Sequence, residues 1–185
     1  FAMGAVFYNQ ACTNYLGDKK LSSASKPNDA PYKKGAKYTG KEHVWDEAFG
    51  YWGAAAHTLT LSPKESYEVA KKKNLTAADY NKDGVVDAGT EMTYAHAYYA
   101  SGFDKGGKTN YLETVTRAFL TGRETITSAK GQKLGWNGRN GGKGIIKQAA
   151  IICSNWEKVI AEAVFKYAGS VYKDLENMKK NTDDA

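Results

Sequence analysis

Apolar residues recur at intervals of three and four along most of this chain, whereas convincing strand-like alternation appears nowhere. This spacing predicts helices, and the first runs from Ala5 to Leu16 with Gly17 as its C-terminal stop. The longest predicted helix, residues 145–178, carries one apolar stripe and spans about 50 Å, enough to back a whole bundle. Further predicted helices cover residues 39–57, 62–73, 90–100, 110–122 and 124–130. The pattern therefore predicts an all-α, up-and-down bundle of about five to seven helices.

Two of these helices begin with recognisable capping signals. Thr39 and Glu42 have the spacing of a capping box, and Ser62 and Glu65 repeat it with proline at the first helical position. Residues 19–38 are polar and read as a long surface loop. A glycine-rich segment, residues 135–144, precedes the longest helix, and its Trp136 is the aromatic residue that we expect to be exposed.

Residues 42–53, EHVWDEAFGYWG, concentrate one histidine, three carboxylates and four aromatic residues on one predicted helix. Helical spacing places His43, Asp46 and Glu47 along one stripe. Imidazole and carboxylates one turn apart can chelate iron or zinc if other helices complete the coordination shell. The same groups could instead form a buried hydrogen-bonded network with Arg117 or Arg123, or perform acid/base catalysis. The sequence leaves these three interpretations open.

A second candidate site is the acidic segment that begins at residue 79. It places oxygen ligands at positions one, three, five, seven and nine of a calcium loop, in the order Asp79, Asn81, Asp83, the carbonyl of Val85, and Asp87. Gly84 stands at position six, where the chain must turn sharply. Thr90 stands at position twelve in place of the usual glutamate, and Glu91 follows it, so a variant loop would bring Glu91 to the ion. We expect calcium to act here as a structural clip; the alternative is an ion-free, Asx-rich turn.

Composition limits the other functional classes. The 185 residues suit a single domain, and no apolar run approaches the roughly 20 residues of a transmembrane helix. The net charge of +6 comes from scattered lysines, so we expect a solvated surface and no nucleic-acid partner. Zincin and serine-hydrolase motifs are missing. Cys12 and Cys153 could form one disulfide or remain two buried thiols.

The segment EHVWDEAFGYWG resembles the EHxWDEAFGYFG core of a bacterial family of unknown function that sits beside the imelysin-like proteins. Four further segments agree with the resemblance: GAVFYNQACTNYLGDKK, the acidic loop from Asp79 to Glu91, AFLTGRETI and NWEKVIAEAVFKY. The resemblance implies an imelysin-like bundle that is exported or lipid-anchored, as a lipoprotein of the periplasm or outer membrane. It also implies that this chain is the C-terminal portion of a longer protein, and Phe1, which is no initiator methionine, agrees with processing or truncation.

Imelysin-like relatives carry a GxHxxE motif thought to bind metal. His43 and Asp46 have the same acid spacing here, although Gly40 lies three residues before the histidine rather than two. We therefore expect a non-enzymatic, calcium-stabilised, extracytoplasmic binding protein that captures metal or a metal-associated ligand. The alternatives are a structural or interaction module that contacts other cell-surface or periplasmic proteins, and a metal-dependent hydrolase.

Overall fold

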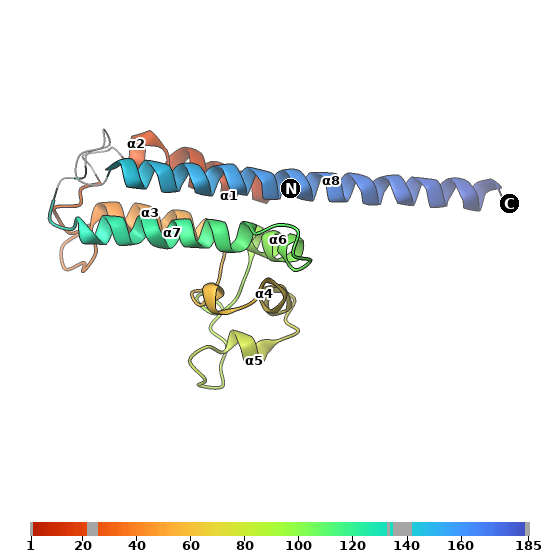
Figure 1. The fold of residues 1–185 in the computed structure, drawn as a ribbon, viewed down its shortest axis with the longest axis horizontal. Coiled ribbons are helices and arrows are strands. Elements are labelled where there is room, and N and C mark those ends of the chain that lie inside the picture. Colours follow the sequence, from red (N-terminus) through yellow and green to blue (C-terminus); the bar gives the residue numbers. More distant parts are fainter. Residues whose placement is uncertain (1, 22–25, 133, 135–141, 184–185) are drawn as a thin grey trace.

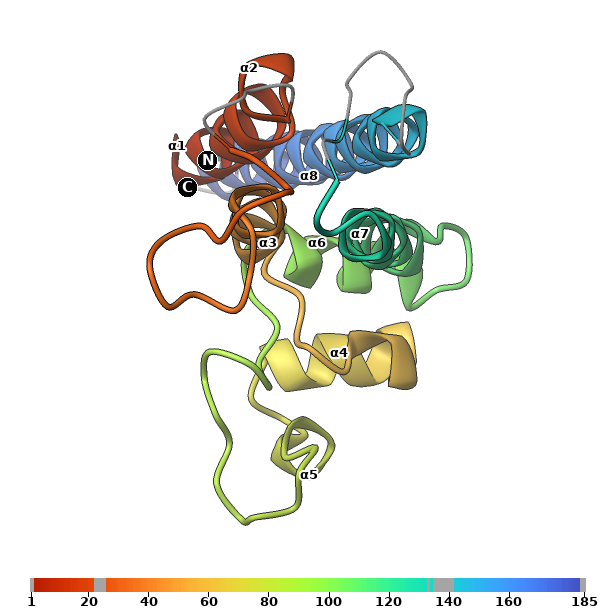
Figure 2. The same ribbon diagram turned by 90° about the vertical axis from the view of Figure 1, so that its left-hand side faces the viewer.

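The computed structural model describes residues 2–21, 26–132, 134 and 142–183, and in these ranges it contains helices and no strand. The longer helices lie along one axis, and a smaller lobe is attached to their side (Figures 1 and 2). The elements are α1 (Ala2–Tyr8), the π-helical η1 (Asn9–Tyr15), α2 (Asp18–Leu21), α3 (Gly40–Trp52), η2 (Thr58–Thr60), α4 (Pro63–Ala70), α5 (Leu75–Ala78), α6 (Ala95–Asp104), α7 (Tyr111–Ser128) and α8 (Gly142–Asp183).

Neighbouring long helices run in opposite directions. The start of α3 meets the end of α7 where Glu42 accepts from Thr127, and the end of α3 meets the middle of α7 where Trp52 donates to Thr116. Helices α7 and α8 are antiparallel as well, since the start of α7 donates from Tyr111 to Glu162 (Figure 1). The predicted all-α bundle is confirmed at this level.

The bundle core is built around buried aromatic side chains. Trp52 and Trp156 meet edge to face with ring centroids 5.0 Å apart, and Trp45 donates from its indole nitrogen to the carbonyl of Phe119. Helices α3 and α7 approach closely because position 122 is glycine: a Cβ there would lie 2.0 Å from the ring of Trp45. A second, smaller core of Val69, Ala78 and Met92 stabilises the lobe that contains α4 and α5 (Figure 2).

Both predicted capping boxes are present, at Thr39 and Ser62, but several helix bounds differ from the predictions. The helix predicted at residues 90–100 runs from Ala95 to Asp104, and the first predicted helix is divided into α1 and η1. Helix α3 ends at Trp52 rather than residue 57, because Gly53 adopts a left-handed conformation (φ 81°) against the backbone of Tyr94. Residues 110–122 and 124–130 were predicted as two helices and form the single helix α7. Gly122 looked like a helix end, yet its role is to admit Trp45.

Helix α8 packs on the bundle over only part of its length. Its residues up to Ala163 include the buried Ile152, Trp156 and Val159, whereas Val171 and Leu175 are 58% and 59% exposed. Tyr167 still lies against Tyr99 of α6. The prediction that one stripe packs along the whole helix is therefore wrong beyond Tyr167, where α8 extends past the other helices (Figure 1). Trp136 lies outside the described residues. Among the helices described, none is long and apolar enough to cross a bilayer.

A disulfide joins Cys12 in η1 to Cys153 in α8, with the two Cα atoms 5.7 Å apart. The residues are 141 positions apart in the sequence, so the bond links the N-terminal helices to the C-terminal one. Of the two possibilities left open by the sequence, the structure has the disulfide.

Candidate functional site

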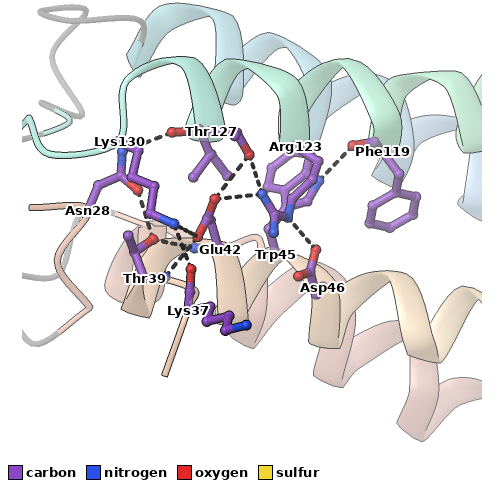
Figure 3. Close-up of polar contacts among 11 residues, drawn as sticks. Asn28, Lys37, Thr39, Glu42, Trp45, Asp46, Phe119, Arg123, Thr127 and Lys130 are labelled. Carbon is purple, nitrogen blue, oxygen red and sulfur yellow. Dashed lines mark hydrogen bonds and ion pairs between the residues drawn. The ribbon is translucent and has the colours of Figure 1, made fainter. Parts of the chain in front are cut away.

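The first turn of α3 buries a glutamate in a polar network that ties α3 to α7 (Figure 3). The Glu42 side chain is 3% exposed. One of its oxygens accepts from Arg123 (2.8 Å) and Thr127 (3.0 Å), and the other accepts from the backbone N–H of Thr39 (2.8 Å). Lys130 adds a second positive charge 3.7 Å away. Burial acts to raise the pKa of Glu42, but these hydrogen bonds and the charge of Arg123 outweigh it, so the pKa lies below its usual value.

Asp46 belongs to the same network and is directed away from His43. Its carboxylate accepts from Arg123 Nε at 2.7 Å, while Arg123 Nη1 reaches Glu42 (Figure 3). The guanidinium thus links two carboxylates one helical turn apart on α3. The interpretation of one buried network of His43 and the acids holds only in part, because Glu42 is buried, Asp46 is 52% exposed and His43 pairs with Glu47 instead. The arginine partner is Arg123, whereas Arg117 pairs with Glu113 on its own helix.

His43 and Glu47 are brought together on the other side of α3. His43 Nε2 lies 3.0 Å from Glu47 Oε1, and the two side chains are 25% and 36% exposed. The His43 ring lies against Tyr32, with centroids 3.9 Å apart. Glu47 also accepts from Tyr15, which raises the pKa of that tyrosine to about 12. The pair is partly exposed to solvent and is flanked by the rings of Tyr32 and Tyr15.

The three predicted metal ligands of α3 therefore separate into Asp46 with Arg123 and His43 with Glu47. Within the described ranges, no group of three or more His, Cys, Asp or Glu side chains comes together in a way that could hold a metal ion. Two protein ligands can still take part in binding a metal that brings further ligands with it.

Loop 79–91 adopts a conformation in which its oxygen side chains accept hydrogen bonds from its own backbone. Asp79 accepts from the N–H groups of residues 83 (3.2 Å) and 84 (3.0 Å), and Asn81 accepts from that of Asp83 (3.0 Å). Asp83 in turn accepts from Val85 (2.8 Å). The backbone is left-handed at Lys82 and Gly84, which folds the loop tightly enough to gather these oxygens on its inner side.

Glu91 closes this loop. It is 5% exposed, and its carboxylate accepts from the N–H groups of Tyr80 (3.0 Å), Asn81 (3.3 Å) and Asp87 (2.9 Å). The side chain of Asp87 faces the other way and accepts from the N–H groups of Gly89 and Thr90. The structure thus places Glu91 inside the loop, with hydrogen bonds to both of its oxygens.

Two features of the structure had no clear signal in the sequence. The ammonium of Lys41 is buried (3% exposed) and donates to the carbonyls of Lys20 and Leu21, and burial lowers its pKa to about 8. A groove of about 1030 Å³ lies between α1, α6 and α8. Its lining is mainly apolar, and its one histidine, His96, is 7% exposed with a pKa lowered by burial to about 4. Neither follows from local spacing, because each combines residues from distant segments.

A family described as Domain of unknown function (DUF4856) matches residues 1–185. No curated protein and no solved structure matches the chain.

Proposed function

The chain belongs to this uncharacterised family, and from its own geometry we propose that it is a non-enzymatic binding protein that works outside the cytoplasm. Its scaffold is stabilised by calcium, and it captures metal or a metal-associated ligand on α3. One observation carries this proposal: α3 commits Glu42 and Asp46 to Arg123 and leaves His43 and Glu47 paired at the surface. The helix thus separates a structural set of side chains from a set that a ligand can reach.

The His43 and Glu47 pair supports capture of a metal that arrives with ligands of its own. An imidazole and a carboxylate suit iron or zinc, but two ligands leave either ion incompletely coordinated. The remaining positions would come from the captured molecule, and Tyr32 and Tyr15 beside the pair offer it aromatic surface and a hydroxyl. A metal-dependent hydrolase needs more convergent protein ligands than these, so we prefer the binding function.

Calcium is the proposed stabiliser of loop 79–91. The donor set fits a hard cation, since Asp79, Asn81 and Asp83 already direct their oxygens to the inner side of the loop. The carbonyl of Val85 would add another oxygen, and the carboxylate of Asp87 would join only by turning away from the N–H groups of Gly89 and Thr90, from which it now accepts hydrogen bonds. Calcium would supply the positive charge that offsets these clustered carboxylates. Glu91 would join the ion by exchanging some of its backbone hydrogen bonds, and otherwise holds the loop closed.

The disulfide between Cys12 and Cys153 supports a location outside the cytoplasm, because such bonds persist mainly in oxidising compartments. The resemblance of residues 42–53 to a family beside the imelysin-like proteins adds a periplasmic or outer-membrane lipoprotein to the proposal. Partners would then be other cell-surface or periplasmic proteins. The alternative function, a structural or protein-interaction module, is favoured by the exposed apolar residues of α8.

Metal analysis of the purified, oxidised protein tests the proposal. At equilibrium in dialysis against zinc and calcium, without desalting, we expect equal calcium in the wild type and in His43→Ala, and more bound zinc in the wild type than in His43→Ala. Glu113→Ala, which removes another surface glutamate from an i,i+4 pair, is the matched control and should retain zinc. Equal zinc in wild type and His43→Ala would overturn metal capture. If His43→Ala unfolds, Glu47→Gln replaces it in the same assay.

The calcium site is tested by thermal unfolding with calcium or with a chelator. Calcium should raise the Tm of the wild type, and the double variant Asp79→Asn/Asp83→Asn should lose that response while remaining folded. Glu113→Gln serves as the acidic surface control. An identical response to calcium in the double variant would place the ion elsewhere.

A further inference from the structure

The C-terminal part of α8 has an apolar surface that the bundle does not cover. Helix α6 contacts α8 as far as Tyr167, which lies against Tyr99, and α7 begins beside α8 at the hydrogen bond between Tyr111 and Glu162. Residues 164–181, here called the arm, are all exposed and extend about 27 Å beyond that point (Figure 1). Val164, Val171, Leu175 and Met178 are between 48% and 67% exposed. These large apolar side chains recur with regular spacing.

The spacing is that of a coiled coil. If Ala161 is position a of a heptad, the a positions are Ala161, Ala168 and Leu175, and the d positions are Val164, Val171 and Met178. The pattern covers three heptads, residues 161–181. Apart from Ala163, which packs on the bundle, the b, c and f positions are polar or glycine: Glu162, Lys166, Gly169, Ser170, Lys173, Glu176, Asn177, Lys180.

This stripe lies on a different face of α8 from the one that packs on the bundle. In the same register the buried residues of the first half fall at c and f: Ile145, Ala149, Ile152, Trp156, Val159, Ala163. The apolar face therefore changes from c/f to a/d where the bundle ends. A helix that merely extended into solvent beyond its bundle would be expected to be polar on every face, without a new apolar stripe.

We propose that the arm pairs with the arm of a second copy of this chain as a parallel, two-stranded coiled coil. In such a pair each g residue faces an e residue of the other copy, five positions further along. Within residues 161–181 the g positions that have a facing e position in the arm are Tyr167 and Asp174, and these e positions are Tyr172 and Lys179. Tyr167 also lies against Tyr99 of α6, with the two hydroxyl groups 3.2 Å apart, so the contact of Asp174 with Lys179 is the one that lies wholly beyond the bundle.

Asp174 and Lys179 are opposite in charge, and a symmetric pair of arms would make this contact twice. Because the sequence complements itself in this register, the partner is a second copy with two-fold symmetry. The inference names the partner for the interaction-module alternative, and it stands whether or not His43 binds metal.

Light scattering coupled to size-exclusion chromatography tests the dimer. The chain has a mass of 20.2 kDa, so we expect about twice that value at high protein concentration, falling toward the single-chain mass on dilution. Val171→Asp places a charge at the central d position and should give the single-chain mass throughout. Ser170→Asp introduces the same side chain at a c position and should remain dimeric.

A wild type that stays monomeric at high concentration overturns the proposal. The arm would then be covered by another protein or by a small apolar molecule instead of a second copy. It would leave the metal result at His43 unaffected, so the two failures are distinguishable.

Cysteine cross-linking tests the parallel register. The two native cysteines are paired with each other, so an added cysteine reports on the arm alone. Val164→Cys and Met178→Cys, at opposite ends of the d stripe, should each form a covalent dimer under mild oxidation, whereas Ser170→Cys should not. If neither variant links to itself but a mixture of the two does, the arms are antiparallel and the proposed register is wrong. Circular dichroism before oxidation confirms that each variant is folded.

Discussion

Glu42 and Glu91 are both buried glutamates, yet one stabilises the packing of two helices and the other stabilises a single loop. Glu42 accepts from Arg123 and Thr127, which lie 81 and 85 positions away, and so joins two helices. Glu91 accepts three backbone N–H groups from residues 4 to 11 positions away, and so closes its own loop. One carboxylate stabilises the bundle and the other stabilises a local turn. Their loss should therefore destabilise different parts of the molecule.

The largest expected effect comes from separating α3 and α7. Gly122→Ala places a methyl group 2.0 Å from the buried ring of Trp45, and neither helix can shift without disturbing the Glu42 network. We expect a loss of at least about 3 kcal/mol in the free energy of unfolding, measured by urea denaturation. Gly50→Ala on α3, where a Cβ meets nothing within 4 Å, is the control and should be neutral or stabilising. Equal effects of the two substitutions would refute the close-contact explanation.

Removing the charge of Glu42 should have the next largest effect. Glu42→Gln leaves Arg123 with Asp46 alone, and we expect a loss of about 2 to 3 kcal/mol at pH 7. Since the pKa of Glu42 is lowered in the folded state, its contribution is present above the unfolded pKa and is lost as the pH falls through the folded pKa. Acid titration followed by circular dichroism should therefore show a smaller loss of stability below pH 4.5 in the variant. An unchanged acid profile would contradict this assignment.

Glu91→Gln should destabilise the loop more than the bundle. Glutamine retains one acceptor oxygen and loses the charge that strengthens the hydrogen bonds to Tyr80, Asn81 and Asp87, at a cost of about 1 to 2 kcal/mol. Hydrogen exchange should become faster at residues 80–91 and stay nearly unchanged in α3 and α7. Faster exchange spread evenly over the whole chain would show that the loop and the bundle unfold as one unit.

His43→Ala should have the smallest effect. The ring is partly exposed, and its pairing with Glu47 is a surface interaction, so we expect a change below about 1 kcal/mol by urea denaturation. A loss of several kcal/mol would make His43 part of the scaffold and would count against a ligand site there.

Local features of this protein could be predicted from its sequence. The capping boxes at Thr39 and Ser62 formed as predicted, and helices begin at both, although each ends earlier than predicted. Loop 79–91 folds inward on the residues that its spacing singled out. Each of these features depends on hydrogen bonds between residues close in the chain, so a short window of sequence contains both donor and acceptor.

The tertiary structure decided which of several local possibilities was used. Helical spacing placed Asp46 and Glu47 on the same stripe, and only the position of Arg123 on α7 directed Asp46 to the scaffold and left Glu47 with His43. A glycine at position 122 could have marked the end of a helix. It lies instead inside α7, where the ring of Trp45 leaves no room for a Cβ. The sequence by itself determined the helical class and the two capped helix starts, because these depend on residues close together in the chain. Which charges meet, which cysteines join and where α8 leaves the bundle depend on partners about a hundred residues away, which local spacing does not contain.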